Sequence, residues 1–404
     1  MTFSNILTSE VTDILSQLET NGFSAFLVGG CVRDAILNRE CNDIDIATNA
    51  TTAQMLEIFD SYETQTAGIG FGTVNVRGKS GNIFDITSFR QEGEYIDGRH
   101  PSSVTFSGDI HTDLSRRDFT VNSMAVNRHA ELVDDYGGLH DCTARQIKTV
   151  RTATVRFSED YLRILRALRF SAVLDFSVEQ QTAEAINELS HLCAKIPPER
   201  AFEELRKLFS TPYNLRLSDI LATFPDIFSI LFGVSDVKKT AERIRKLESK
   251  TNFILKLAMI FFEANPQNCN LLNHKNFLSK SDEKLFYSLL YTDSQKLQNR
   301  ADVIKQINLL GKENVELLTI LKDDSPTEKK LIHQVQTDIT AGLFPFSANE
   351  LAVKGTDLIN IGLHGKTIGN ALEKLLFCVQ NKMLANEKKA MLDYIESTFL
   401  KDKK

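Results

Sequence analysis

Two aspartates, Asp43 and Asp45, stand two residues apart in NDIDIAT (42–48), where polar and apolar residues alternate as they do in a strand. Side chains two apart on a strand point to the same face, so we expect the two carboxylates to lie together. Adjacent negative charges are costly unless cations neutralise them, and hard oxygen ligands suit Mg²⁺. Two such ions would hold the attacking and leaving oxygens of a phosphoryl or nucleotidyl transfer. A pair of this kind also occurs in turns and solvated strands, so it does not decide the chemistry alone.

A glycine turn precedes the aspartates. The apolar run FSAFLVGG (23–30) predicts a buried strand that ends in paired glycines, after which helical spacing resumes. Gly30 closes this turn, and its missing Cβ lets a phosphate approach backbone N–H groups at a helix N-terminus. Arg33, one turn into the helix, is placed to add a charge-assisted contact. The turn alone is no more specific than the aspartate pair, but their order and spacing together indicate a nucleotide site.

A third carboxylate belongs to another expected strand, NIFDITSF (82–89). If that strand is a neighbour, Asp85 lies beside Asp43 and Asp45; the alternative is a solvated surface position. We therefore predict Asp43, Asp45 and Asp85 as catalytic residues, with Asp43 and Asp45 as the metal ligands.

The stretch EDYLRILRALRFSAVL (159–174) has helical spacing, on which Asp160 and Arg163 would lie side by side. An acceptor beside a donor matches the Watson–Crick edges of cytosine and adenine, which present an amino group beside an unprotonated ring nitrogen. Uracil and guanine present the reverse pattern, and each mismatched buried group costs about 1–3 kcal/mol. Arg166 and Arg169 are placed to reach phosphates or to stabilise the pocket. The alternative is an ordinary ion pair within the helix.

The elements that must position these residues change in character along the chain. Up to about residue 150, an amphipathic helix (9–21) is followed by alternating strands and helices. Beyond Val155, strand signals nearly vanish and helical periodicity dominates. Polar stretches such as KDDSPTEKK (322–330) are expected to connect helices. The predicted fold class is α+β, with a mixed N-terminal domain followed by helical regions; the expected boundaries are 1–150, 151–215, 216–335 and 336–404.

The composition of the 404 residues is that of an ordinary globular protein, with a formal net charge of −6. This average argues against a nucleic-acid partner, but it hides an asymmetry. Residues 1–150 carry 11 basic and 21 acidic side chains, whereas residues 151–404 carry 36 and 32. Six scattered cysteines without a CxxC pair predict reduced thiols in a cytoplasmic protein. Neither a secretory signal nor a membrane-spanning stretch is visible.

Five segments, taken in order, resemble the motifs of the class II tRNA nucleotidyltransferases, the family of CCA-adding enzymes and bacterial poly(A) polymerases. These segments are LVGGCVRDAILNRECNDIDIAT (27–48), RRDFTVNSMAV (116–126), DDYGGLHD (134–141), EDYLRILRALRF (159–170) and PERAFEELRKLF (198–209). FRQEGEYIDGRHPSSVTF (89–106) resembles the flexible loop of complete CCA-adding members, and residues 350–375 resemble the tail of bacterial members. The chain departs from common family usage at Asn38, where asparagine tolerates the left-handed conformation that a frequent glycine adopts.

The resemblance implies template-independent addition of CCA to the 3′ end of tRNA from CTP and ATP, with Asp43 and Asp45 holding two Mg²⁺ ions. One of these aspartates would also help to activate the 3′-hydroxyl group. The nucleotide-binding residues that it implies are Gly30, Arg33, Arg117, Asp160, Arg163, Arg166 and Arg169, with Gly29, Arg116, Asp118 and Asn122 as further candidates. Without the family, residues 116–126 indicate only a charged turn before a buried strand or helix.

The fifth motif is expected to be structural, with Glu199 and Glu204 bracing the arginine-bearing helix through ion pairs. The partners implied are the acceptor end of tRNA, CTP and ATP, with neither DNA nor a membrane, and a homodimer stays open. An A-adding enzyme or a poly(A) polymerase of the same family is the alternative function. A third hypothesis is a non-catalytic RNA-binding protein whose head domain has lost its activity. Such a loss should first remove a metal-binding carboxylate, yet all three are present.

Overall fold

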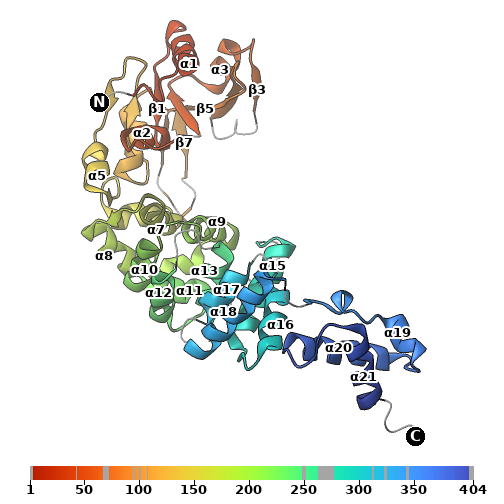
Figure 1. Cartoon of the computed structure of the whole chain (residues 1–404). Helices are drawn as coiled ribbons and strands as arrows, with labels where there is room; N and C mark the ends of the chain where they lie inside the picture. Colours follow the sequence, from red (N-terminus) through yellow and green to blue (C-terminus); the bar gives the residue numbers. More distant parts are fainter. Residues whose placement is uncertain are drawn as a thin grey trace. The chain divides into compact units, whose positions relative to one another are not determined.

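The computed structural model describes residues 3–41, 43–66, 72–93, 95, 97–99, 102–106, 108–247, 252–262, 277–311, 314–322, 325–342 and 345–399 (Figure 1). The chain divides into two compact units. The first comprises Met1–Phe253 and Ala264–Phe277, and the second comprises Ile254–Glu263 and Leu278–Lys404. The residues predicted to do chemistry all belong to the first unit.

A seven-stranded mixed sheet forms the N-terminal part of the first unit. Its strands follow the order β3-β4-β5-β2-β1-β8-β9. Their bounds are β1 Ala25–Val28, β2 Ile44–Thr48, β3 Glu63–Gln65, β4 Thr73–Arg77, β5 Ile83–Ser88, β8 Ala125–Val126 and β9 Leu132–Val133. A separate antiparallel hairpin is formed by β6 Arg90–Glu92 and β7 Val104–Phe106, within the segment that resembles the flexible loop.

The register of the central strands brings the predicted carboxylates together. Strands β2 and β5 pair in parallel, and Asp45 stands opposite Asp85. Asp43 directly precedes β2, so it lies on the same face as Asp45. The expectation that Asp85 comes from a neighbouring strand is therefore confirmed.

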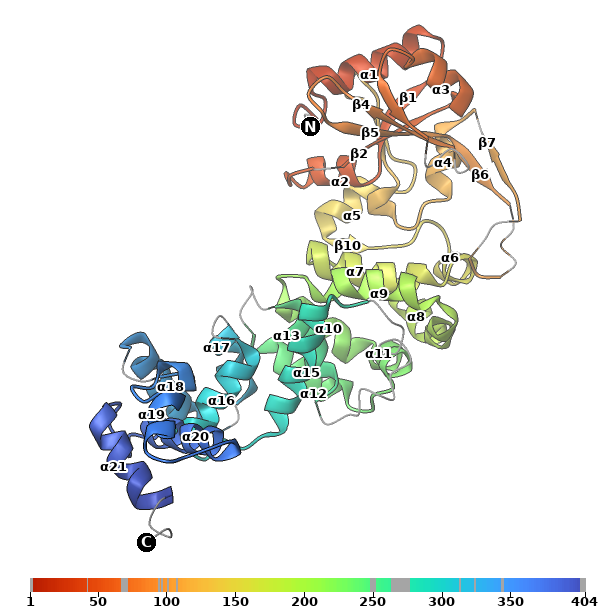
Figure 2. The same ribbon diagram turned by 90° about the vertical axis from the view of Figure 1, so that its right-hand side faces the viewer.

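Helices cover both faces of this sheet. Helices α1 (Ser9–Thr20) and α3 (Thr52–Ile58) lie on one side, and α2 (Gly30–Ile36) and α5 (Gly138–Ala144) lie towards the other (Figure 2). Helix α4 (Ile110–Ser115) and the 3₁₀ turn η2 (Thr120–Asn122) precede β8. Asn38, just beyond α2, has a φ of 51°, so the predicted left-handed conformation is confirmed.

Helices make up the remainder of the first unit. They are α6 Ala153–Glu159, α7 Leu162–Leu174, α8 Gln180–Glu188, η3 Ser190–Lys195, α9 Pro198–Phe209, α10 Asn214–Thr223, α11 Pro225–Phe232 and α12 Val237–Arg245. Two short strands, β10 (Gln146–Ile147) and β11 (Ser177–Val178), pair in parallel and interrupt this helical region. The single helix expected from residue 159 is wrong at its start, because α6 ends at Glu159 and α7 begins at Leu162.

Helices are the only regular secondary structure among the described residues of the second unit. Its helices are α13 Phe253–Ile260, whose first residue belongs to the first unit, α15 Lys280–Ser294, α16 Arg300–Leu310, α17 Val315–Leu321, α18 Pro326–Thr340, η6 Ala348–Glu350, α19 Gly355–Asn360, α20 Lys366–Gln380 and α21 Lys388–Phe399. The stretch 322–330 is only partly a connector, because Pro326 occupies the first turn of α18, where its missing N–H costs nothing. The last three helices share an apolar core around Leu358, Leu375 and Met391.

A mixed sheet domain followed by helices confirms the predicted α+β class. Within the described residues, no helix is both long and apolar enough to cross a membrane. The four-part division of the chain stays a prediction.

Candidate active site

An open cleft of about 720 Å³ in the first unit gathers the predicted site residues. It collects thirteen of the fourteen predicted residues from segments that are far apart in the sequence, leaving only Asp85 outside its lining. Those thirteen are Gly29, Gly30, Arg33, Asp43, Asp45, Arg116, Arg117, Asp118, Asn122, Asp160, Arg163, Arg166 and Arg169. Eight arginines and seven acidic residues line the cleft, so positive and negative side chains are present in nearly equal numbers.

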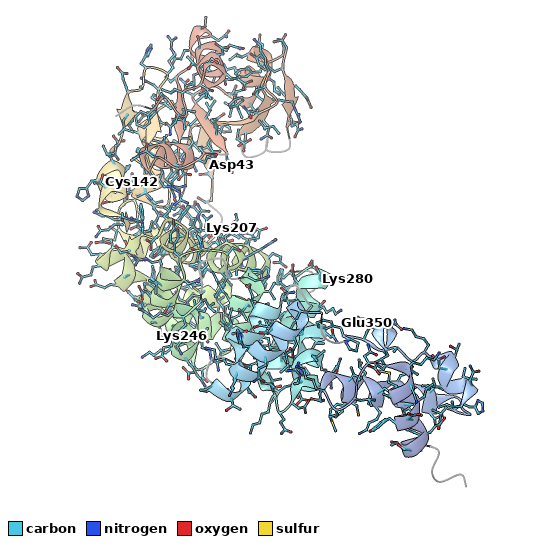
Figure 3. The ribbon with its side chains drawn as sticks, in the orientation of Figure 1. Asp43, Cys142, Lys207, Lys246, Lys280 and Glu350 are labelled. Atoms are coloured by element: carbon cyan, nitrogen blue, oxygen red, sulfur yellow. The ribbon has the colours of Figure 1, made fainter. Side chains whose placement is uncertain are left out.

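The sheet contributes the carboxylates of the cleft. Asp43 lies on the side of the sheet domain nearest to α7 (Figure 3), and both Asp43 and Asp45 are exposed to the cleft. Asp85 is half-buried, and its carboxylate accepts a hydrogen bond from the side-chain amide of Asn75 on β4. Asp85 is therefore a neighbour of Asp45 in the sheet rather than part of the cleft wall.

The electrostatics at Asp45 suit a cation. Protein atoms packed around Asp45 desolvate its carboxyl and raise its pKa, and repulsion from Asp85 and Asp43 raises it further, while Arg117 opposes both effects. Among the described residues, no group of three or more His, Cys, Asp or Glu side chains is arranged to hold a metal ion. Asp43 and Asp45 offer two carboxylates, and a Mg²⁺ ion bound through one or two carboxylates is completed by water and substrate phosphates.

The glycine turn accommodates an arginine. Gly29 has a φ of 74°, and a Cβ placed on it would lie 2.7 Å from Nη1 of Arg117. The backbone conformation at position 29 therefore favours glycine, and the missing Cβ leaves the space that this guanidinium group occupies. Arg33 is buried beside the turn, where its Nη1 donates to Oδ1 of Asn122 at 2.6 Å. The turn and the second motif therefore form one wall.

A buried aspartate orients the two arginines of the second motif. The carboxylate of Asp113 accepts hydrogen bonds from Arg116 at 2.7 Å and from Arg117 at 3.0 Å. Burial raises the pKa of Asp113, but Arg117 and Arg116 outweigh this effect and lower the pKa overall. Sequence reasoning missed Asp113, although its spacing of three and four residues to the arginines on a helix was a usable signal.

A buried network around Asp118 ties the sheet domain to α7. The Asp118 carboxylate accepts from Nε of Arg166 at 2.8 Å, from Nδ2 of Asn122 at 3.2 Å and from its neighbour's backbone N–H. Burial alone would raise the pKa of Asp118, but Arg166 and these hydrogen bonds lower it to about 2. In this structure Asp118 therefore holds Arg166 in place.

Asp160 and Arg163 take different partners from the one expected. Asp160 lies between α6 and α7 with an extended backbone, and its carboxylate pairs with Arg200 of α9 at 3.0 Å. Arg163 is buried, and its guanidinium donates to Glu159 and, at 3.1 Å, to the backbone oxygen of Arg156. Both side chains line the cleft, so the two groups stay available to one ligand although they do not pair along a helix.

Helix α9 and one aromatic ring support the arginines of α7. Glu204 is buried and pairs with Arg169 at 2.6 Å and with Arg166 at 3.8 Å, which confirms the expected brace, whereas Glu199 is exposed. The Phe170 ring lies 4.0 Å from the guanidinium carbon of Arg169 and 5.4 Å from that of Arg166. Cation–π contacts of this kind favour a fixed guanidinium position.

The cysteines near this site are single thiols. Cys31 and Cys142 are buried and Cys41 is half-buried, and all three are free. Burial raises the pKa of Cys142 to about 12, so this thiol stays protonated at neutral pH. Cys41 lines the cleft, and a hydrogen bond with Cys31 lowers the pKa of its thiol.

Two family models match the first unit. Residues 25–148 match the poly A polymerase head domain, and residues 175–223 match the probable RNA and SrmB-binding site of polymerase A. The two matched segments contain Asp43 and Asp45 and the helices that follow α7.

Known proteins match nearly the whole chain. A CCA-adding enzyme of Oceanobacillus iheyensis is 32% identical, and the alignment covers 96% of both chains. A CCA-adding enzyme of Streptococcus thermophilus is 45% identical over 200 residues, a match that spans about half of each chain. The crystal structure of the Bacillus stearothermophilus CCA-adding enzyme in complex with CTP superposes with a TM-score of 0.75 at 27% identity, covering 98% of this chain and 99% of that chain.

Proposed function

Because the chain belongs to the family of the CCA-adding enzymes, we propose that it adds C, C and A in turn to the 3′ end of tRNA. The substrates are CTP and ATP, the products are the extended tRNA and pyrophosphate, and no nucleic-acid template takes part. One observation carries this proposal. The carboxylates of Asp43 and Asp45, at the start of β2 (called the sheet edge below), line the same cleft as the arginines of α7.

The carboxylate side of the cleft binds the metal and the reacting end of the primer. Asp43 and Asp45 hold Mg²⁺, which supplies electrostatic stabilisation of the attacking and leaving oxygens when it is bound. One of the two also helps to activate the 3′-hydroxyl of the tRNA. Asp85, opposite Asp45, keeps this edge of the sheet negative and so favours cation binding.

The opposite walls bind the nucleotide. Arg117, fixed by Asp113 against the glycine turn, contacts the triphosphate together with Arg33. Asp160 accepts the exocyclic amino group that cytosine and adenine share, and Arg163 donates to the adjacent ring nitrogen. UTP and GTP present the opposite groups at both positions, so they are rejected without a template.

The helical regions hold the tRNA. The regions 151–215, 216–335 and 336–404 follow the head domain (1–150) in the sequence and act as neck, body and tail. They recognise the acceptor end of tRNA by its shape and phosphates. Their small excess of basic side chains predicts modest, salt-sensitive binding. The protein acts in the cytoplasm.

A direct assay tests this proposal. Three tRNA transcripts, ending before the first C, after one C and after two, are each incubated with Mg²⁺ and either CTP or ATP. CTP is expected to extend the first two transcripts and ATP the third, and EDTA is expected to stop both reactions.

The same assay separates the related activities. Incorporation of ATP alone, limited to one residue on the third transcript, would establish an A-adding enzyme instead. Long adenylate tracts would establish a poly(A) polymerase. The absence of incorporation on every transcript would reject nucleotidyl transfer to tRNA altogether.

A further inference from the structure

We propose that Arg200 is a positioning residue for nucleotide selection, because it holds the Asp160 carboxylate in the orientation that accepts the amino group of CTP or ATP. This inference rests on the proposed function and adds a residue of the fifth motif to its specificity apparatus. Arg200 lines the same cleft as Asp160.

Asp160 lies outside both neighbouring helices, and only one hydrogen bond from α7 restrains its side chain. It follows the last residue of α6 and precedes α7 by one residue, with φ −139° and ψ 107°. An aspartate there has two rotatable side-chain bonds, and the backbone N–H of Leu162 restrains only one of its oxygens, Oδ1. A group that discriminates between bases must instead be held close to its productive geometry.

The contacts of Asp160 supply that restraint and still leave room for a ligand. Arg200 approaches both oxygens, with Nη2 at 3.0 Å from Oδ2 and Nη1 at 3.5 Å from Oδ1, while the backbone N–H of Leu162 donates to Oδ1 at 3.0 Å. A carboxylate offers about four acceptor positions, so these three donors leave one for an amino N–H. The planar guanidinium fixes the plane of the carboxylate, which a single point charge would not do.

Arg200 is itself held by the way α9 packs. It lies in the first turn of α9, one turn before Glu204, which pairs with Arg169 and Arg166 of α7. The buried side chains of α9, among them Leu205 and Leu208, fix the helix independently of Arg200. Removal of the Arg200 guanidinium should therefore release Asp160 without displacing the helix.

Arg163 has separate support, so the effect of Arg200 is specific. Glu159 and the backbone oxygen of Arg156 hold the Arg163 guanidinium. Loss of Arg200 should therefore disturb the contact of Asp160 with the amino group of the base. The contact of Arg163 with the ring nitrogen should remain. Discrimination between CTP and UTP should fall more than the rate of transfer itself.

The test compares Arg200→Ala and Arg200→Lys with Arg206→Ala, a matched control because Arg206 is exposed on the same helix. For each protein, kcat/KM is measured with CTP and with UTP on tRNA ending before the first C. We expect the CTP-to-UTP ratio to fall about tenfold in Arg200→Ala, the worth of one charged hydrogen bond, to fall less in Arg200→Lys and to be unchanged in Arg206→Ala. In an Asp160→Ala background, Arg200→Ala should change the ratio no further.

The outcomes separate the inference from the function on which it rests. A wild-type protein that incorporates no CTP overturns both. If the wild type incorporates CTP, equal losses for CTP and UTP in Arg200→Ala would show a merely structural role and overturn the inference. Independent losses in the double variant would overturn it too. If thermal unfolding shows that Arg200→Ala does not fold, Arg200→Lys decides, because it keeps the charge and loses the planar pair: an unchanged ratio in this variant overturns the inference.

Discussion

On one side of the cleft, the sheet edge brings Asp43 and Asp45 together, with Asp85 behind them, whereas on the other side α7 presents arginines that already have acidic partners. The pKa of Asp45 is raised by desolvation and by its acidic neighbours. Arg166, in contrast, lies against Asp118 and Glu204. The sheet edge thus keeps an excess of negative charge that a cation would relieve, while α7 is ordered before any ligand arrives.

This difference in charge pairing indicates that the two sides of the cleft have different functions. A partly desolvated carboxylate cluster gains free energy when a divalent cation binds, which suits a site that assembles with its substrate. Arginines fixed by protein carboxylates lose little entropy on meeting a ligand, which suits selection. Substitutions on the sheet edge should therefore abolish catalysis with little effect on stability, and substitutions in the network of α7 should affect stability.

The largest effect is expected from Asp43→Ala and Asp45→Ala. Each should reduce nucleotide addition by roughly a thousandfold or more, because the metal loses half of its protein ligands. The thermal unfolding temperature and tRNA binding should change little, since both side chains are exposed and mutually repelling. Asp60→Ala is the control, an exposed aspartate outside the cleft lining. Addition at near wild-type rates in either cleft variant would refute the metal assignment.

The second largest effect is expected from Asp118→Asn, and here the effect should be on stability. The variant should lower the free energy of unfolding by about 3 kcal/mol, because Arg166 loses its main charged partner in a buried position. Urea unfolding of this variant and of the exposed control Asp60→Asn provides the measurement. A loss below about 0.5 kcal/mol, the usual range for a surface change, would contradict the bracing role.

The pH dependence of the Asp118 contribution is a smaller and sharper test. The folded-state pKa of Asp118 is about 2, below its ordinary value of 3.8, so its ionised form is favoured in the folded protein. Its stabilisation of about 2 kcal/mol is fully present above about pH 5 and is lost as the pH falls through 3.8 towards 2. The stability difference between wild type and Asp118→Asn should therefore narrow only in that window. A difference that narrows instead between pH 5 and 7 would assign the effect to another group.

The smallest effect is expected from Glu204→Gln, since the glutamine keeps the size of the side chain and loses only its charge. We expect a loss of about 1–2 kcal/mol in the free energy of unfolding, because Arg169 and Arg166 lose one shared partner. The control Glu203→Gln, at an exposed position of the same helix, should change stability by less than about 0.5 kcal/mol. Equal losses in the two variants would show that Glu204 does not brace α7.

Much of the site could be predicted because it depends on local pattern. Alternation placed Asp43 and Asp45 on one face, and the paired glycines marked the strand-to-helix turn at Gly30. The resemblance to the CCA-adding enzymes identified the family, which relatives that span nearly the whole chain confirm. The α+β class followed from the loss of strand periodicity after residue 150. Which of the predicted residues act in catalysis stays a prediction.

The sequence by itself therefore determined which residues could take part in the chemistry and which strands and helices carry them. Strand and helix periodicity relate residues that are close in the chain. Tertiary structure decided the partners. Asp160 pairs with Arg200, forty residues away, and Asp85 faces Asp45 only because β2 and β5 are neighbours in the sheet. Ion pairs of this kind depend on how separate elements pack and on how deeply the charges are buried. The spacing of residues along the chain predicts neither the packing of separate elements nor the burial of the charges.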